Sequence, residues 1–346
     1  MTSSTPHSKR TLAGRAVNPI GLGCMGMSEF YGPTDEAESL AVLEAAIELG
    51  VEHFDTADMY GFGHNESLLG RFLAAPGRRD KVFLATKCGI VRDPVNNSLR
   101  GVDNSPAYIV EACERSLQRL GTHIDLFYLH RIADGGSQIE HSMEGMAQLL
   151  NDGKIGAVGL SEANADMTRR ADAALRSMTD GRHGIAAIQS EYSLLTRTVE
   201  GNGVLDTCRE IGAALVAYSP ISRGLLSDDF QGMQQLAADD FRRYLPRFAE
   251  GALAHNQQIV ADVRAIAEKH RASSAQVALA WLLHRSPIVH PIPGTKRISY
   301  LQQNAGAVQL QLDTADLTTL DQLLVARSVQ GERYAPEALA AFTMDA

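Results

Sequence analysis

The sequence predicts an α/β fold, a single-domain (β/α)8 barrel of the TIM type, from three observations. Eight short runs rich in Val, Ile, Leu and Ala recur along the 346 residues, and longer amphipathic stretches separate them. The runs lack polar–apolar alternation, which is typical of parallel strands covered on both faces. No Pro/Ser-rich linker or change of composition divides the chain. One large barrel therefore fits the sequence better than two smaller domains.

The eight expected strands can be placed in order, because each apolar run ends at polar or turn-forming residues. The expected strands lie at 19–23, around Phe54, and at 82–87, 124–130, 155–161, 186–192, 214–220 and 288–294.

Helices are expected between these strands, and two of them have clear ends. Over 35–50, apolar residues recur at i, i+3 and i+4, and Gly50 ends the pattern. The segment 105–121 begins with a serine suited to N-capping and a proline at the first helical position. After Leu312 we expect one more amphipathic helix, followed by a tail that contains Tyr334.

Three further segments, the N-terminus, a short stretch after it and a long polar stretch late in the chain, can be interpreted from their composition. Residues 1–10 are polar and lack the apolar segment of a signal peptide, so we expect a disordered leader before a barrel domain at 11–346. Residues 9–17 favour a small hairpin over the barrel floor. The long polar segment 221–255 is expected to form a loop over the active mouth.

Charge and cysteine usage narrow the class of protein. A net charge of −9 argues against a general nucleic-acid binder, and no apolar stretch is long enough to span a bilayer. We expect no nucleic-acid or membrane partner and a cytoplasmic location. The cysteines lie far apart without zinc-site spacing, so we expect reduced core thiols. They are Cys24, Cys88, Cys113 and Cys208.

The segment Gly21–Gly26 matches the G-x-G-x-x-G pattern of dinucleotide-binding Rossmann folds. That motif requires a helix to begin within it, so that the helix N-terminus faces a pyrophosphate. Here a turn-rich run follows, and the helical pattern starts only near Asp35. We therefore interpret these glycines as a tight turn at the mouth of the first barrel strand.

Four residues of complementary chemistry lie at or just after the ends of expected strands: Asp55, Tyr60, Lys87 and His130. Barrel enzymes keep their chemistry at this end of the strands. Tyr60 is the candidate general acid for a carbonyl oxygen, and a nearby Lys87 ammonium would lower its ordinary pKa of about 10. Asp55 would keep Lys87 charged, and His130 could hydrogen-bond the carbonyl oxygen.

Each of these four residues alone has an ordinary structural explanation, such as a packed ring or a solvated amine. Their convergence is what favours a carbonyl-reducing site. A metal site from His53, Asp55, Asp58 and His64 is the alternative. Its residues lack the spacing of known metal motifs, and Lys87 would repel a cation, so we expect no metal.

These motifs resemble those of the aldo–keto reductase superfamily, over about Arg10 to Leu324. The matching stretches are GLGCMGMSEFYG, FDTADMYGFGHNESLLG, LATKCG, IDLFYLHR, GKIGAVGLSE, IQSEYSLLTR, VAYSPISRGLL and IPGTKRISYLQQN. The resemblance implies a TIM barrel and an NADPH-dependent oxidoreductase acting on CH–OH donors. Such an enzyme reduces aldehyde and ketone carbonyls, here with Tyr60 as general acid.

The resemblance also implies a set of residues that bind the cofactor NADPH/NADP. Ser161 and Gln189 would hydrogen-bond the nicotinamide carboxamide, and the ring of Tyr218 would stack on it. Glu162 stands where many relatives have asparagine, so no amide-binding role is assigned to it. The implied contacts are Gly23, Cys24, Met25, Asp55, Ser161, Gln189, Tyr218, Ser219, Pro220, Ile221, Arg223, Leu225, Gly294, Thr295, Lys296, Arg297, Gln303 and Asn304.

The cluster Thr295, Lys296 and Arg297 suits a 2′-phosphate and favours NADP over NAD, although Tyr300 stands where many relatives have another arginine. Apolar mouth residues such as Phe30 favour a hydrophobic or aromatic small-molecule carbonyl substrate. Two other functions stay open: a nicotinamide-binding regulatory subunit with little turnover, and an alcohol or sugar dehydrogenase working in the oxidative direction.

Overall fold

The computed structural model describes residues 9–93, 95–96, 99–230 and 232–335. Its main sheet has eight strands that pair in parallel and in chain order. They are β3 (Leu22–Gly23), β4 (His53–Asp55), β5 (Phe83–Cys88), β8 (Leu126–Leu129), β9 (Val158–Ser161), β10 (Ile185–Glu191), β11 (Ala214–Tyr218) and β12 (Val289–Pro291). The predicted TIM-type barrel is confirmed.

The barrel closes where β3 meets the end of β12. Gly23 forms a parallel bridge with Gly294, and the Gly21 amide donates to the Pro291 carbonyl at 2.9 Å. A Cβ atom on Gly23 would lie 2.9 Å from the Ile292 carbonyl oxygen, so only glycine permits this approach. A single 3-10 turn (Met25–Met27) begins inside the glycine motif, but as expected no α-helix does, because α1 starts only at Glu36.

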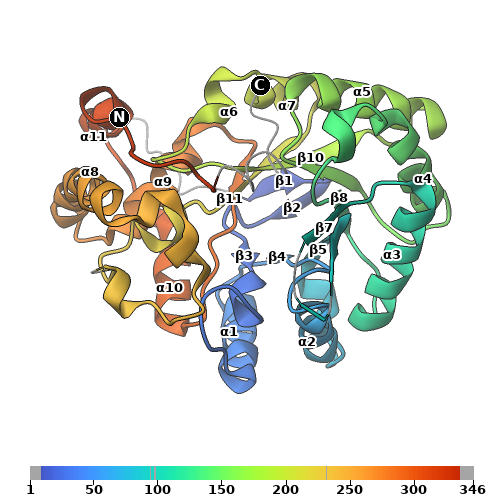
Figure 1. Cartoon of the computed structure of the whole chain (residues 1–346), viewed down its shortest axis with the longest axis horizontal. Helices are drawn as coiled ribbons and strands as arrows, with labels where there is room; N and C mark the ends of the chain where they lie inside the picture. The colour runs from blue at the N-terminus through green and yellow to red at the C-terminus, as the bar shows by residue number, and fades with distance from the viewer. Residues whose placement is uncertain (1–8, 94, 97–98, 231, 336–346) are drawn as a thin grey trace.

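Helices surround the barrel, which Figure 1 views roughly along its axis. They are α1 (Glu36–Glu48), α2 (His64–Leu73), α3 (Pro106–Leu120), α4 (Ile139–Asn151), α5 (Ala165–Met178), α6 (Thr198–Gly201), α7 (Val204–Ile211), α8 (Glu250–His270), α9 (Ser274–Arg285), α10 (Ile298–Gly306) and α11 (Thr314–Ala326). Side-chain caps fix the starts of several helices: Asp35 accepts from the Glu38 amide at 2.8 Å before α1.

The predicted hairpin consists of β1 (Arg10–Leu12) and β2 (Arg15–Val17), and it closes the floor of the barrel. Leu12 and Val17 are fully buried with side chains of the barrel interior. Arg10 donates to the carbonyls of Leu283, Ser286 and Val289. The predicted leader is therefore wrong at Arg10, and its first eight residues lie outside the described part of the chain.

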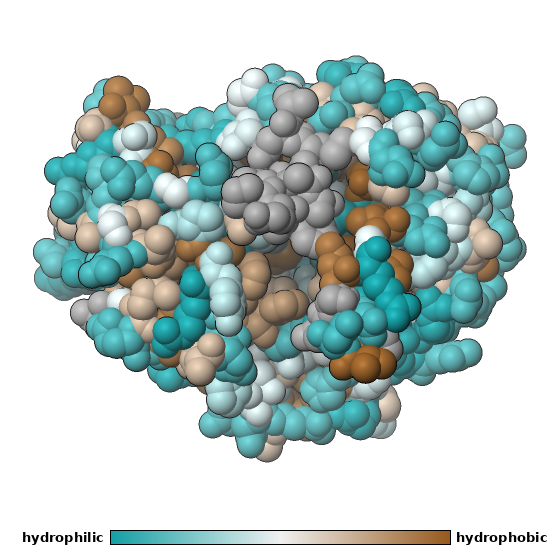
Figure 2. All heavy atoms as spheres, viewed as in Figure 1, coloured by the Kyte–Doolittle hydropathy of each residue, from teal (hydrophilic) through white to brown (hydrophobic). Residues whose placement is uncertain are grey.

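Two segments over the mouth differ from the sequence expectation. An additional antiparallel hairpin, β6 (Ile90–Arg92) and β7 (Leu99–Val102), follows β5. The expected loop 221–255 contains short 3-10 turns, and its last residues already belong to α8. Figure 2 shows this face of the molecule hollowed near its middle, with hydrophobic side chains at the walls of the hollow.

Burial accounts for the four cysteines, all of which are buried and free of disulfides. Among the described residues, no helix is both long and apolar enough to cross a membrane. Residues 336–346 of the expected tail lie outside the described part, whereas Tyr334 is buried.

Candidate active site

Three neighbouring strands bring the four predicted catalytic residues to one end of the barrel. Asp55 ends β4, Lys87 lies next to the end of β5, and His130 directly follows β8. Tyr60 belongs to the turn between β4 and α2. Because β4, β5 and β8 are adjacent and parallel, their carboxyl ends share one edge of the sheet.

Asp55 and Lys87 form a buried ion pair in which the ammonium donates to Asp55 Oδ1. The same ammonium donates to the Thr56 carbonyl at 2.7 Å. Gln189 Nε2 donates to the other carboxylate oxygen of Asp55 at 2.8 Å. The carboxylate is therefore fixed from two sides, and it holds the Lys87 ammonium beneath the cavity floor.

The aromatic members of the site face each other above this ion pair. The rings of Tyr60 and His130 lie with centroids 5.7 Å apart and planes at 82°. Lys87 Nζ lies 5.2 Å from the centroid of the Tyr60 ring. Tyr60, His130 and Asp55 line one cavity, while Lys87 is completely buried. The structure thus brings all four residues together.

The titration behaviour differs from the sequence expectation at Tyr60. Burial raises the pKa of its phenol well above the ordinary value, and the charge of Asp55 raises it further. The predicted lowering of this pKa is therefore wrong, because burial and the charge of Asp55 outweigh the opposing positive charge of Arg131. Burial also lowers the pKa of Lys87, with Asp55 opposing that shift. Burial together with Lys87 and Arg131 lowers the pKa of His130 far enough that its imidazole is neutral.

The cavity has a volume of about 1380 Å³ and extends from Tyr60 and His130 to the start of α10. A pocket for a drug-sized ligand has about 300–1,000 Å³, so this one is large enough for a ligand of greater size. Most of the predicted cofactor contacts line it: Gly23, Cys24, Met25, Asp55, Gln189, Tyr218, Ser219, Pro220, Ile221, Arg223, Gly294, Thr295, Lys296, Arg297, Gln303 and Asn304.

Two predicted contacts do not line the cavity. The side chain of Leu225 packs in the hydrophobic core between barrel and helices, so it offers no side-chain contact to the cavity, and the expected pyrophosphate contact stays a prediction. Ser161 is completely buried, and its Oγ accepts a hydrogen bond from Arg131 Nη1 at 3.2 Å. The Ser161 hydroxyl, which was expected to hydrogen-bond a carboxamide, is therefore already hydrogen-bonded to Arg131.

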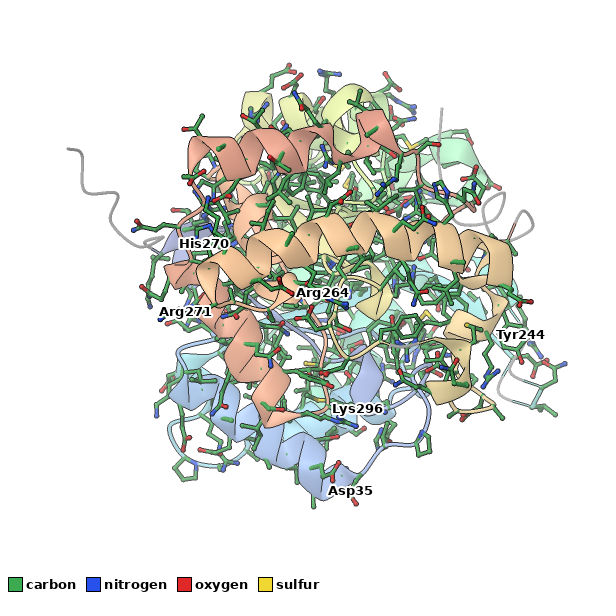
Figure 3. The ribbon with its side chains drawn as sticks, turned by 90° about the vertical axis from the view of Figure 1, so that its left-hand side faces the viewer. Asp35, Tyr244, Arg264, His270, Arg271 and Lys296 are labelled. Atoms are coloured by element: carbon green, nitrogen blue, oxygen red, sulfur yellow. The ribbon has the colours of Figure 1, made fainter. Side chains whose placement is uncertain are left out.

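Two cations, Lys296 and Arg297, line the end of the cavity near α10, and each has different hydrogen-bond partners. Lys296 Nζ donates to the carbonyls of Tyr31 at 2.8 Å and Pro33 at 2.7 Å, and burial lowers its pKa. Figure 3 shows Lys296 beside α10, above the chain that leads to Asp35. Arg297 is exposed, with Nη1 3.3 Å from the Tyr300 hydroxyl.

Arg223 lines the cavity and is held in place by an acid and two rings. Its guanidinium is 3.4 Å from Glu191 and 4.8 Å from the ring centroid of Tyr334. The ring of Phe241 lies 5.6 Å away on the same cation. Its position is therefore fixed before any ligand arrives.

Several functional candidates were missed by the sequence reasoning. Arg131 lines the cavity, and its Nη1 donates to the His130 carbonyl at 2.6 Å. Its place directly after His130 was the one available signal. Tyr334 also lines the cavity, with its hydroxyl 3.3 Å from that of Tyr218. Its segment has no periodic pattern, and its contacts are all distant in sequence, so no local signal existed.

Glu162 has a structural partner in place of an amide. Its carboxylate forms a buried ion pair with Arg333 at 3.2 Å and accepts from the Glu191 amide at 3.0 Å. For the metal alternative, the described part of the chain contains no group of three His, Cys, Asp or Glu side chains placed to hold an ion.

A barrel with a phenol, an ammonium, a carboxylate and an imidazole at one mouth defines a class of oxidoreductase, and comparison gives the family. Residues 19–325 match the model of the aldo/keto reductase family, and the chain belongs to that family. The chain is 38% identical over 339 residues to "Aldo-keto reductase yakc [NADP(+)]" of Schizosaccharomyces pombe, covering 97% of each chain.

Solved structures share the fold over nearly the whole chain. Glycerol dehydrogenase AKR11B4 from Gluconobacter oxydans superposes with a TM-score of 0.82 at 26% identity, over 96% of this chain and 99% of that chain. An aldo/keto reductase from Klebsiella pneumoniae, in complex with NADP and acetate, gives 0.70 at 27% identity over 95% and 99%.

Proposed function

We propose that the protein is an NADPH-dependent reductase that converts aldehyde and ketone carbonyls to alcohols, with Tyr60 as the proton donor. The observation on which this rests is that the Tyr60 phenol and the His130 imidazole meet beside the buried Asp55–Lys87 ion pair, at one end of a cavity whose other end is lined by Lys296 and Arg297. The NADP(+) in the name of the fission-yeast relative and the NADP bound in the Klebsiella structure support the cofactor.

The residues of the cavity fit a phosphorylated dinucleotide. Arg223 lines the cavity with a side chain that is largely buried, and Arg297 stands directly before α10. A helix N-terminus and guanidinium groups both favour phosphate oxygens. We propose that Arg297 contacts the 2′-phosphate, with Lys296 joining it by exchanging its carbonyl partners. Gln189 and the Tyr218 ring would orient the nicotinamide.

Bound NADPH supplies a hydride for the carbonyl carbon. As negative charge develops on the carbonyl oxygen, Tyr60 gives its phenolic proton to that atom. The raised pKa of Tyr60 keeps this proton in place at neutral pH. Transfer is still favourable, because an alkoxide is more basic than a phenolate. The Lys87 ammonium near the ring then stabilises the phenolate.

His130 has a separate part in this reaction. Its imidazole is neutral and contacts the Tyr60 ring edge to face. Its Nδ1 is completely buried without a partner among the described residues, so Nε2 is the nitrogen that can donate into the cavity. A neutral imidazole has one N–H to donate. We assign this donor to the substrate oxygen, so that two hydrogen bonds fix the carbonyl before hydride transfer.

The walls near Tyr60 favour an apolar substrate. Phe30, Met59, Ile90, Leu99 and Phe241 all line the same cavity. Burying apolar substrate surface against them contributes about 25 cal/mol per Å². We therefore propose a hydrophobic or aromatic carbonyl compound as substrate.

The test is the absorbance of reduced nicotinamide during turnover, with aromatic, aliphatic and polar aldehydes and ketones of similar size. The proposal expects steady NADPH consumption, fastest with the aromatic aldehydes. Consumption limited to one equivalent of NADPH per protein would instead indicate a regulatory subunit. Faster turnover with NADP and an alcohol would favour the oxidative direction, for which the likeness to a glycerol dehydrogenase is the specific argument.

A further inference from the structure

Arg92, the last residue of β6, connects three segments at the mouth of the barrel. Its Nη1 and Nη2 donate to the two carboxylate oxygens of Glu29 at 2.8 and 3.1 Å. Nη1 also donates to the Met59 carbonyl at 2.7 Å. The Arg92 side chain is only 7% exposed. A forked, partly desolvated pair of this kind is stronger and more directional than a surface ion pair.

Two aromatic rings from different loops pack against the same guanidinium. Arg92 Cζ lies 4.4 Å from the ring centroid of Phe62 and 5.5 Å from that of Phe30. Phe62 and Phe30 both have positive φ, at 53° and 74°. A bulky residue in the left-handed region is strained and persists only where the surroundings impose that conformation. Phe30 and Phe62 both adopt this conformation where they pack on Arg92, so the surrounding structure imposes their positions.

We define the Arg92 clamp as Arg92, Glu29, Phe30, Phe62 and the carbonyl of Met59. That carbonyl belongs to the peptide bond directly before Tyr60, so the clamp fixes the backbone from which the phenol projects. Within the described part of the chain, the phenolic oxygen has no hydrogen bond to another side chain. The ring packs instead against His130.

We propose that Arg92 is a positioning residue that sets the Tyr60 phenol for proton transfer and, with Phe30, forms a fixed wall of the substrate mouth. Arg92, Phe30 and Met59 line the cavity beside Tyr60, so a change in the clamp reaches the reacting groups directly. A misplacement of about 1 Å in such a site can lower the rate about 10²-fold. This inference rests on the proposed role of Tyr60.

The test compares Arg92→Ala and Arg92→Lys with the wild-type protein by steady-state kinetics, and measures NADPH affinity by fluorescence. We expect Arg92→Ala to lower kcat about 10²-fold while the Kd for NADPH changes little, because the cations assigned to the phosphates are untouched. Arg92→Lys keeps the positive charge but cannot pair with both carboxylate oxygens of Glu29 in the same way. Its kcat is therefore expected to lie between those of the wild type and Arg92→Ala. Added guanidinium chloride at millimolar concentration should restore part of the activity of Arg92→Ala only.

Arg100→Ala is the matched control, because Arg100 lies on the same hairpin but its side chain is 59% exposed and forms an ion pair with Asp93, away from the clamp. It should retain wild-type kcat. Thermal unfolding of each variant separates misfolding from misplacement, and Glu29→Gln, which keeps the shape of the clamp, gives a milder second variant. Full kcat in Arg92→Ala, or a rise in KM alone, overturns the inference. A wild-type protein without turnover, or an active Tyr60→Phe, instead overturns the proposed function.

Discussion

Burial, more than the neighbouring ammonium, determines the state of Tyr60. The phenol keeps its proton because Asp55 compensates Lys87 and water is largely excluded. The mechanism therefore uses Lys87 after proton transfer, when a phenolate exists to be stabilised. The Lys87 ammonium does not have to move when the phenolate forms, because hydrogen bonds to Asp55 and to the Thr56 carbonyl already fix it near the ring.

The Tyr60→Phe variant tests this residue directly. We expect turnover to fall by at least about 10²-fold, the size typical of a lost general acid, while NADPH still binds. The measurement is steady-state kinetics together with a fluorescence titration of NADPH. Tyr108→Phe is the control, because Tyr108 lies on α3 outside the cavity and its loss should leave turnover unchanged. Wild-type turnover in Tyr60→Phe would remove the assignment.

Cofactor preference is a second prediction at this scale. Lys296→Ala combined with Arg297→Ala should weaken NADPH binding about 10-fold or more, because charge-assisted hydrogen bonds to a phosphate are lost. NADH binding should change little. Lys296 also holds the carbonyls of Tyr31 and Pro33, so the single Arg297→Ala variant isolates the phosphate contact.

Titration of each variant with NADPH and NADH measures the ratio of the two Kd values. Arg271→Ala serves as control, since Arg271 is an exposed cation at the end of α8 and does not line the cavity. Equal weakening of both nucleotides in the double variant contradicts a 2′-phosphate site.

Among the larger elements, the segment after α11 is attached to the rim of the barrel by the buried Arg333, whose shortest ion pair is with Glu162. Arg333 binds Glu162 just beyond β9, and Tyr334 then reaches the cavity beside Tyr218. Glu162 has positive φ (55°), so the backbone there is strained as well. This pair explains why a carboxylate stands where an amide was expected by resemblance.

Glu162→Gln is expected to lower the free energy of unfolding by about 3 kcal/mol, because it leaves a buried guanidinium without its main carboxylate. Urea denaturation measures the change. Glu210→Gln is the control, since its ion pair with Arg169 is exposed on both sides and its loss should have no measurable effect. A Glu162→Gln protein as stable as the wild type would show that the pair contributes nothing.

The sequence predicted those elements whose order is set by local pattern. The eight strands and the meeting of Asp55, Lys87 and His130 follow from apolar runs, because parallel barrel strands share one catalytic edge. The hairpin β6–β7 and the Arg333 contact were not predicted, since distant partners rather than local periodicity determine them. The sign of the Tyr60 pKa shift also depends on depth of burial, which the sequence does not give.

For the molecule as a whole, two buried histidines make stability depend on pH. Burial lowers the pKa of His53 to about 3, with Lys87 adding to the shift. Burial and the nearby His53 lower the pKa of His290 to about 3 as well. The unfolded chain binds protons at these sites below about 6.5, whereas the fold keeps them neutral. Their contribution to stability is therefore present above pH 6.5 and is lost as the pH falls toward 3.

His53→Leu is expected to reduce this acid sensitivity, because both ring nitrogens of His53 are buried without a hydrogen-bond partner among the described residues. Urea denaturation at pH 7.5 and pH 5 measures the difference, which should be smaller in the variant than in the wild type. His141→Gln replaces a half-exposed histidine on α4 and should leave the difference unchanged. An unaltered pH slope in His53→Leu contradicts the assignment.

The seam between Gly23 and Gly294 has a consequence for biosynthesis. A ribosome releases the first of these glycines long before the second, so the nascent cylinder stays open along one side until translation is almost finished. During that interval the backbone amides on the open edge of β3 are unpaired and could form hydrogen bonds with a strand of another chain. Ring closure, and with it the completed nucleotide groove, must be a late event in the life of each newly made molecule.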